Sequence, residues 1–128
     1  MATLLTVLSL TFLFGVLIAS AQVTSDVIED YILRVSVAEG VSAQMAWDIA
    51  KCETRFNPMA HNKQDPNGGS RGIYQFQEKT FYNFAKKYGI DNPDIWNPYQ
   101  QVNLAIYILR DGGANHWFNC YQKHLKMV

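Results

Sequence analysis

The chain has 128 residues, which is enough for one compact domain but not for two. Its 11 Lys and Arg balance its 11 Asp and Glu, so no global charge attracts it to nucleic acid or to an anionic membrane. The composition is that of an ordinary globular protein, with aromatic residues somewhat enriched at 13%. We therefore expect a single globular domain and no nucleic-acid partner.

The N-terminal segment differs in composition from the rest. Residues 4–18 carry no charge, and Ala-Ser-Ala at residues 19–21 has the small-x-small pattern that signal peptidase cleaves. We expect residues 1–21 to be an export signal and residues 22–128 to form the mature domain. No Lys or Arg precedes the apolar run, so the alternative is an uncleaved membrane anchor, since roughly 20 apolar residues just span a bilayer. Either way the domain lies outside the cytoplasm.

Helical spacing of apolar residues predicts two helices after this segment. The first begins at a capping residue, Ser25 or Asp26, and ends at Gly40. The second has Ser42 as its N-cap and ends before Asn-Pro at residues 57–58, because the residue before a proline disfavours the helical region.

Turn residues and a short apolar run then interrupt the helical pattern. Residues 61–72 are crowded with Asn, Asp, Pro and Gly, which indicates a loop. The apolar run GIYQFQ, residues 72–77, is too short for a helix and predicts a small strand or an extended turn.

Three more helices are expected in the C-terminal half. One follows residue 77 and is capped by Gly89. The next has Asn97 as its N-cap and Pro98 in its first turn, and it ends at Gly112. A last short helix covers residues 115–124. The sequence thus predicts a mostly α single domain of about five helices with one short extended segment.

Cys52 and Cys120 are the two cysteines of the chain. Two thiols in an exported protein usually pair. A disulfide between them closes a loop of about 69 residues and stabilises by roughly 4 kcal/mol in the chain-entropy model. No CxxC or HxxxH spacing accompanies the cysteines, so we expect no metal site.

Glu53 stands in the last turn of the second predicted helix, whereas Asp48 and Lys51 lie on its polar side. On that helix it shares a face with four apolar residues: Met45, Ala46, Ile49 and Ala50. The negative end of the helix dipole and the apolar neighbours both disfavour a carboxylate there. Both effects raise the pKa of Glu53, as a general acid requires. The alternative is a boundary glutamate that turns to solvent or pairs with Arg55 or Arg71.

Three stretches together resemble the lytic transglycosylases with a goose-lysozyme-like SLT domain. Glu53 is followed by an aromatic-Asn-Pro-x-Ala stretch at residues 56–60. The family's Gly-hydrophobic-Met-Gln-hydrophobic-x-Pro-x-Thr pattern is filled in order, with Glu78 where Pro is common, by Gly72, Ile73, Tyr74, Gln75, Phe76 and Thr80. Residues 97–109 are similar to the family's later helix. The ending HWFNC is similar to small exported or phage-associated relatives. The resemblance covers about residues 42–121, with Thr54 where Ser is usual and Gln101 where Asn is usual.

This resemblance implies a lysozyme-like fold and cleavage of the β-1,4 bond between MurNAc and GlcNAc in peptidoglycan. Glu53 acts in that reaction as general acid and then as base, and the product ends in 1,6-anhydroMurNAc. No second carboxylate is obviously placed for the paired arrangement of other glycosidases. Asp65 and Asp94 look like turn residues, and Glu78 is explained by its place at a helix start.

Six residues are candidate substrate contacts: Gln75, Tyr74, Thr54, Ser70, Gly72 and Trp117. Gln75 is expected to donate its amide to a sugar acetamido or ring substituent. Tyr74 and Trp117 are candidates for stacking on sugar faces, although aromatic rings are more often part of a core. Gly72 suits close approach of a ligand or an unusual backbone conformation.

The disulfide would tie the helix that carries the catalytic acid to the C-terminal helix.

The sequence leaves two other functions open: a lysozyme-like hydrolase of the same bond, and a glycan-binding module without turnover. No cofactor is expected. The expected partner is a peptidoglycan glycan strand bound by a monomer, with membrane contact only through residues 1–21 if they stay attached. The expected location is periplasmic, extracellular or cell-wall associated.

Overall fold

The computed structural model describes residues 23–128, so the predicted signal at residues 1–21 lies outside the described part of the chain. The helices are α1 (Ser25–Glu39), α2 (Ala43–Thr54), α3 (Glu78–Lys87), α4 (Pro98–Arg110), the 3₁₀ helix η1 (Ala114–Trp117) and α5 (Phe118–Leu125). Three short strands complete the fold: β1 (His61–Asn62), β2 (Ser70–Arg71) and β3 (Phe76–Gln77). The expected mostly α, lysozyme-like single domain is confirmed.

The strands form one antiparallel sheet in the order β1-β2-β3. Residues 61–72, which we expected to be a loop, therefore form a hairpin whose two strands have only two residues each. The extended segment predicted within residues 72–77 is a turn followed by β3. Strands this short leave no periodic pattern in the sequence, which is why the hairpin was not predicted.

Two of the three predicted helix N-caps are confirmed. Ser42 Oγ accepts the N–H of Met45 at 3.2 Å, and Asn97 Oδ1 accepts the N–H groups of Tyr99 and Gln100. The first helix has Thr24 as its N-cap in place of Ser25 or Asp26. Its first turn is closed one residue earlier than expected, because the Thr24 carbonyl already accepts the N–H of Ile28 at 3.2 Å.

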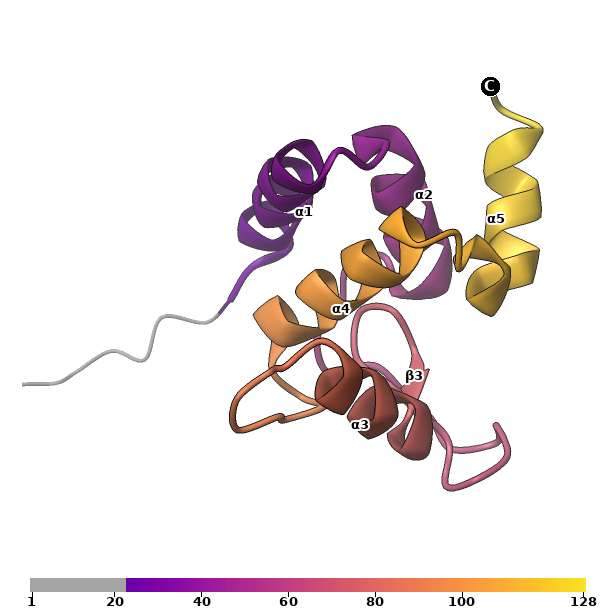
Figure 1. Ribbon diagram of the computed structural model, residues 1–128. Helices are drawn as coiled ribbons and strands as arrows, with labels where there is room; N and C mark the ends of the chain where they lie inside the picture. The colour runs from indigo at the N-terminus through magenta and orange to yellow at the C-terminus, as the bar shows by residue number, and fades with distance from the viewer. Residues whose placement is uncertain (1–22) are drawn as a thin grey trace, which may run out of the picture.

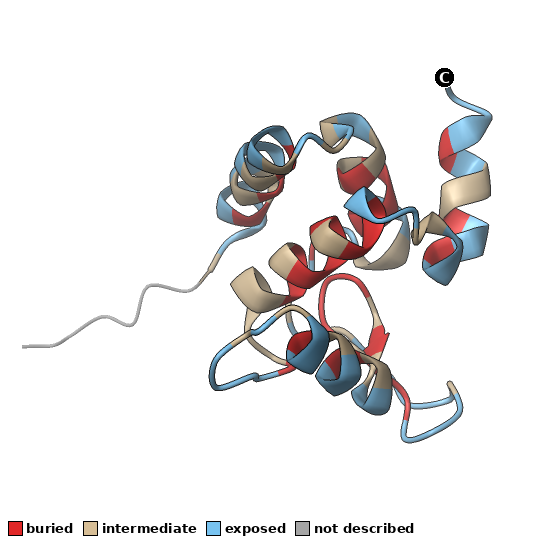
Figure 2. Ribbon diagram, in the orientation of Figure 1, coloured by how far each residue is buried: buried red, intermediate tan, exposed pale blue. Residues whose placement is uncertain are grey.

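Helix α4 forms the centre of the domain, between α1 and α2 on one side and α3 on the other (Figure 1). Figure 2 shows that much of its length is buried, whereas α1 and α3 each keep one exposed face. Four of its apolar residues at helical spacing are buried: Val102, Ala105, Ile106 and Leu109. Among residues 23–128, no helix is long and apolar enough to cross a membrane.

A disulfide and a buried His–Asp contact link α5 to α2. Cys52 and Cys120 form the expected disulfide, with their Cα atoms 5.7 Å apart. One helical turn away on each helix, His124 Nδ1 lies 2.7 Å from Asp48 Oδ2. Asp48 also accepts a hydrogen bond from Gln44, and it is buried, which corrects its expected place on the polar side of the helix. It can be buried because both of its oxygens have partners.

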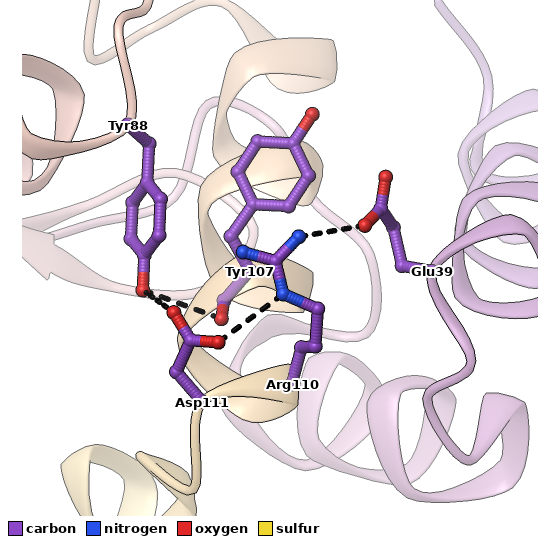
Figure 3. A network of polar contacts seen from close by, with 5 residues as sticks. All are labelled: Glu39, Tyr88, Tyr107, Arg110 and Asp111. Atoms are coloured by element: carbon purple, nitrogen blue, oxygen red, sulfur yellow. Dashed lines mark hydrogen bonds and ion pairs between the residues drawn. The ribbon is translucent and has the colours of Figure 1, made fainter.

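A polar cluster joins the C-terminal ends of three helices (Figure 3). Arg110, the last residue of α4, donates to Glu39 of α1 at 2.7 Å and to Asp111 at 3.2 Å. Tyr88, which follows α3, donates its hydroxyl to Asp111 at 2.6 Å, and the Arg110 guanidinium lies 5.1 Å from the centre of the Tyr107 ring. This cluster holds α1 and α3 to the end of the central helix.

The buried side chain of Gln101, on α4, holds the turn that precedes β3. Its Oε1 accepts the N–H of Tyr74 at 3.0 Å, and its Nε2 donates to the carbonyls of Arg71 at 2.8 Å and Ile95 at 2.7 Å. Gly72 has a φ of +75°, and a Cβ at that position would lie 2.1 Å from Gln101 Nε2. Glycine is therefore required there both by its backbone conformation and by the amide packed against it.

The disulfide yields the first prediction. Cys52 and Cys120 should react with a thiol reagent only after reduction, and Cys52→Ala with Cys120→Ala should lower the free energy of unfolding by about 2–5 kcal/mol, because the unfolded chain regains its loop entropy. Urea denaturation measures the difference. Reduced wild-type protein, the matched control, should unfold at the same urea concentration as the double variant. Free thiols in the native protein would contradict the pairing.

Gly72→Ala should destabilise the domain by about 1–3 kcal/mol more than Gly89→Ala. Both glycines have positive φ, so both variants carry backbone strain, but nothing lies within 4 Å of a Cβ at Gly89. At Gly72 the added methyl group displaces Gln101 and breaks its three hydrogen bonds. Thermal and urea unfolding of the two variants measure the difference, and equal losses would show that Gln101 moves without cost.

Candidate active site

Glu53 opens onto a cleft of about 430 Å³ between the end of α2 and the hairpin. Helix α2 ends at Thr54, earlier than Asn57-Pro58 requires, because Arg55 adopts the left-handed conformation while its N–H bonds the Lys51 carbonyl at 3.0 Å. Ten residues line the cleft: Glu53, Asp65, Pro66, Ser70, Gln75, Phe76, Gln77, Thr80, His116 and Trp117. The carboxyl of the last helical turn is therefore open to a mostly polar hollow.

The pKa of Glu53 is raised above its ordinary value, as the sequence predicts. Burial is the main cause, and the negative charge of Asp65 acts in the same direction, whereas Lys123 of α5 opposes both. The alternative pairing with Arg71 is not what the structure shows, since Arg71 contacts Glu78 at 3.3 Å and donates to the Gly68 carbonyl. Glu53 is thus a half-buried acid whose protonated form is favoured.

Gln75 lines the cleft, but its amide nitrogen is already used. The Nε2 atom donates to the carbonyls of Gly72 at 2.9 Å and Ala60 at 3.3 Å. The residue itself has a φ of +52°, which turns the chain back toward β3. The expected donation from Gln75 to a sugar therefore needs correction: the polar atom that remains for a ligand is the side-chain oxygen, an acceptor.

Ser70 also lines the cleft, and its hydroxyl has a partner within the protein. Ser70 Oγ donates to Asp65 Oδ2 at 2.5 Å, and Asn62 Nδ2 donates to the other oxygen of Asp65 at 2.9 Å. Ser70 lies on β2 and Asn62 on β1, so the hairpin holds the Asp65 carboxylate between its two strands.

Three of the predicted substrate contacts hold the turn at residues 71–76 and do not line the cleft. Tyr74 is fully buried, and its hydroxyl donates to the Ala46 carbonyl at 2.8 Å, so its ring faces no solvent and cannot stack on a sugar. Thr54 Oγ1 donates to the Ile73 carbonyl at 2.8 Å, which ties the end of α2 to the turn. Gly72 makes room for Gln101, and no ligand is needed to explain it.

Trp117 borders both the cleft and the hydrophobic core. It lines the cleft, but it is only 5% exposed, and its Nε1 donates to the Tyr74 carbonyl at 2.7 Å. Its ring also packs against Tyr74 and Phe76, with ring centres 5.6 and 5.7 Å apart. Because the ring is almost wholly enclosed by the core, the expected stacking on a sugar face is corrected: Trp117 forms part of the cleft floor.

Several cleft residues were not predicted from the sequence, and Asp65 is the most consequential of them. It lies in the hairpin among turn residues, so its composition suggested a turn and nothing more. His116 of η1 and Thr80 of α3 reach the cleft from elements that are distant in the sequence. No local pattern marks these positions, because only the packing of the hairpin, η1 and α3 around the end of α2 brings them together.

The cleft is suited to proton transfer. It combines a half-buried acid of raised pKa with polar groups from both walls, which are the requirements of general acid–base chemistry on a neutral polar substrate. Within residues 23–128, no three or more His, Cys, Asp or Glu side chains are grouped so that they could hold a metal ion.

Comparison with known proteins gives a family assignment. No curated protein and no solved structure matches the chain. The family model described as the transglycosylase SLT domain matches residues 30–119, which is well over half of the chain. The match includes Glu53, the hairpin and the turn held by Gln101. On this match, the chain belongs to the transglycosylase SLT domain family.

Proposed function

We propose that this protein cleaves the β-1,4 bond between MurNAc and GlcNAc in peptidoglycan, with Glu53 as the general acid and base. Family membership implies peptidoglycan lytic transglycosylase activity in general. The observation that supports Glu53 in this role is its place at the open end of α2, in the cleft, with burial that raises its pKa.

The first step transfers the proton of Glu53 to the glycosidic oxygen as the bond to the anomeric carbon breaks. The acetamido group of MurNAc assists at that carbon. The Glu53 carboxylate then takes the proton of the MurNAc 6-hydroxyl, whose oxygen attacks the anomeric carbon and closes the 1,6-anhydro ring. Glu53 ends protonated, as it began, and no water is consumed. A raised pKa serves both steps, because it favours the acid form first and makes the carboxylate a better base afterwards.

Gln75 contributes to this mechanism as an acceptor. Its amide nitrogen is held by the carbonyls of Gly72 and Ala60, which leaves the side-chain oxygen for a ligand. An acceptor facing the N–H of the acetamido group polarises that amide and makes its carbonyl oxygen more nucleophilic. This is the atom that assists at the anomeric carbon.

The proposed location is exported: periplasmic, extracellular or cell-wall associated. SLT domains act on peptidoglycan outside the cytoplasm, and the disulfide between Cys52 and Cys120 is consistent with an oxidising compartment. We propose residues 1–21 as the export signal, or as an anchor if they remain attached, and a monomer acting on glycan strands.

A lysozyme-like hydrolase is the second candidate, and Asp65 is the observation that favours it. Hydrolysis requires a water molecule held near the anomeric carbon, which a second carboxylate commonly provides. No such carboxylate is apparent from the sequence, but Asp65 lines the same cleft as Glu53. The two candidates differ only in whether water or the 6-hydroxyl completes the reaction.

Glu53→Gln should keep the fold and reduce muropeptide release from purified peptidoglycan by at least about a hundredfold, because the amide has no proton to transfer. Circular dichroism checks the fold. Glu78→Gln is the matched control: this acid is mostly exposed and outside the cleft, so its variant should retain at least about a tenth of wild-type turnover. Substantial activity in Glu53→Gln would remove Glu53 from the role of general acid.

Mass spectrometry of the released muropeptides should separate the two candidates. We expect 1,6-anhydroMurNAc ends, which are lighter by one water than the reducing ends of hydrolysis. Asp94→Asn should not alter the product, since Asp94 lies outside the cleft and caps the N–H of Trp96. Reducing ends as the main product, with the product changed in Asp65→Asn, would establish the hydrolase.

A further inference from the structure

The carboxylate of Asp65 is fixed in place on the wall of the cleft opposite α2. Ser70 Oγ donates to one of its oxygens at 2.5 Å, and Asn62 Nδ2 donates to the other at 2.9 Å. Both donors come from strands of the hairpin, so the side chain cannot turn away without breaking two hydrogen bonds. Ser70 is itself almost fully buried, at 3% exposed. Hydrogen bonds to a carboxylate are about twice as strong as neutral ones, and a pair of them fixes its orientation.

The backbone of the hairpin is shaped to keep this arrangement. Gly69, just before Ser70, has a φ of +89°, and a Cβ there would lie 2.6 Å from the Asn62 carbonyl oxygen. The two strands thus approach so closely behind Asp65 that only glycine fits. Asn62 Oδ1 also accepts the N–H of Gln64 at 3.2 Å, which leaves its Nδ2 directed at Asp65. The hairpin backbone and the Asn62 side chain therefore both hold the Asp65 carboxylate in place.

Few charged groups surround Glu53. Asp65 of the hairpin and Lys123 of α5 act on it with opposite sign, and His116 of η1 lines the same cleft. Of the other charged groups near α2, His124 is paired with Asp48, and Glu29 of α1 accepts a hydrogen bond from Trp47. Asp65 is therefore the negative charge that Glu53 experiences within the cleft, where reduced solvation strengthens the interaction.

We propose that Asp65 is a positioning residue of this site: a fixed negative charge, held by Ser70 and Asn62, that favours the acid form of Glu53 in the cleft they share. The inference rests on the proposed role of Glu53 as general acid. Loss of the Asp65 charge lowers the pKa of Glu53, so the acid form disappears at a lower pH. The alkaline limb of the activity profile then moves toward acid.

The direct test is a titration of the glutamate side chains in the free protein, followed by ¹³C NMR. The chain has four glutamates, and the Glu53 signal is the one that is missing in Glu53→Gln. In Asp65→Asn the Glu53 midpoint should fall by about half a pH unit or more. Asp91→Asn, which removes the same charge from an exposed position outside the cleft, should leave the midpoint unchanged. This measurement requires no substrate.

The second readout is the pH profile of kcat/KM on peptidoglycan. Asp65→Asn should move the alkaline limb by the same amount as the NMR midpoint and keep most of the activity on the acid side. Ser70→Ala, which frees the carboxylate but keeps its charge, should move both readouts less and in the same direction. Asparagine has the size of aspartate, and Asp65 is not part of the hydrophobic core, so the variant is expected to fold.

The outcomes are distinct. An unchanged Glu53 midpoint in folded Asp65→Asn would overturn the inference. Loss of activity at every pH would also overturn it, because Asp65 would then act on the reacting atoms. A shifted midpoint in a protein whose wild type releases no muropeptides would support the Asp65–Glu53 coupling and overturn the proposed function.

Discussion

The hydrogen bonds of the Gln101 carboxamide are the interaction on which the candidate site depends. This side chain is fully buried on the central helix, and it bonds the backbone at Arg71, Tyr74 and Ile95. A turn has few backbone hydrogen bonds of its own, so its buried polar groups need partners from elsewhere. Removing the amide would leave these groups unsatisfied, at a cost of about 1–3 kcal/mol for each. The shape of the turn, and with it the place of Gln75 in the cleft, depends on these hydrogen bonds.

Several residues of the family's sequence pattern therefore hold the backbone in place and do not face the cleft. Thr54 and Trp117 bond two successive carbonyls of the turn, while the Tyr74 hydroxyl bonds the backbone of α2. The bonds of Thr54 and Tyr74 join the helix that carries Glu53 to the segment that carries Gln75, and the bond of Trp117 joins η1 to the same segment. On its other side, α2 is fastened to α5 by the disulfide next to Glu53. The acid is thus held between two fixed partners, as a catalytic group must be if its geometry is to be preorganised.

The site carries an energetic cost that fits a functional role. Glu53 has a folded-state pKa above its ordinary value of 4.5, so the folded protein binds this proton more tightly than the unfolded chain. The associated stability is present at low pH and is lost as the pH rises through the folded-state pKa. Above that pKa, ionised Glu53 is therefore unfavourable for folding. Half-burial of the acid and the negative charge of Asp65 thus lower stability at high pH, a cost that is typical of functional sites.

Local patterns in the sequence determined the helices and the place of Glu53 in the last turn of one of them. Helix geometry determines which residues within a few positions of one another are neighbours. The caps at Ser42 and Asn97 depend on such local contacts, as does the place of Glu53 at the end of an apolar stripe. Tertiary structure alone decided which side chains face the cleft: it buried Tyr74 in the core and brought Asp65 into the same cleft as Glu53. Two-residue strands have no readable period, and the contacts of a turn depend on elements far away in the chain. Those placements follow from how the hairpin closes against α2 and α4, which no short stretch of sequence encodes.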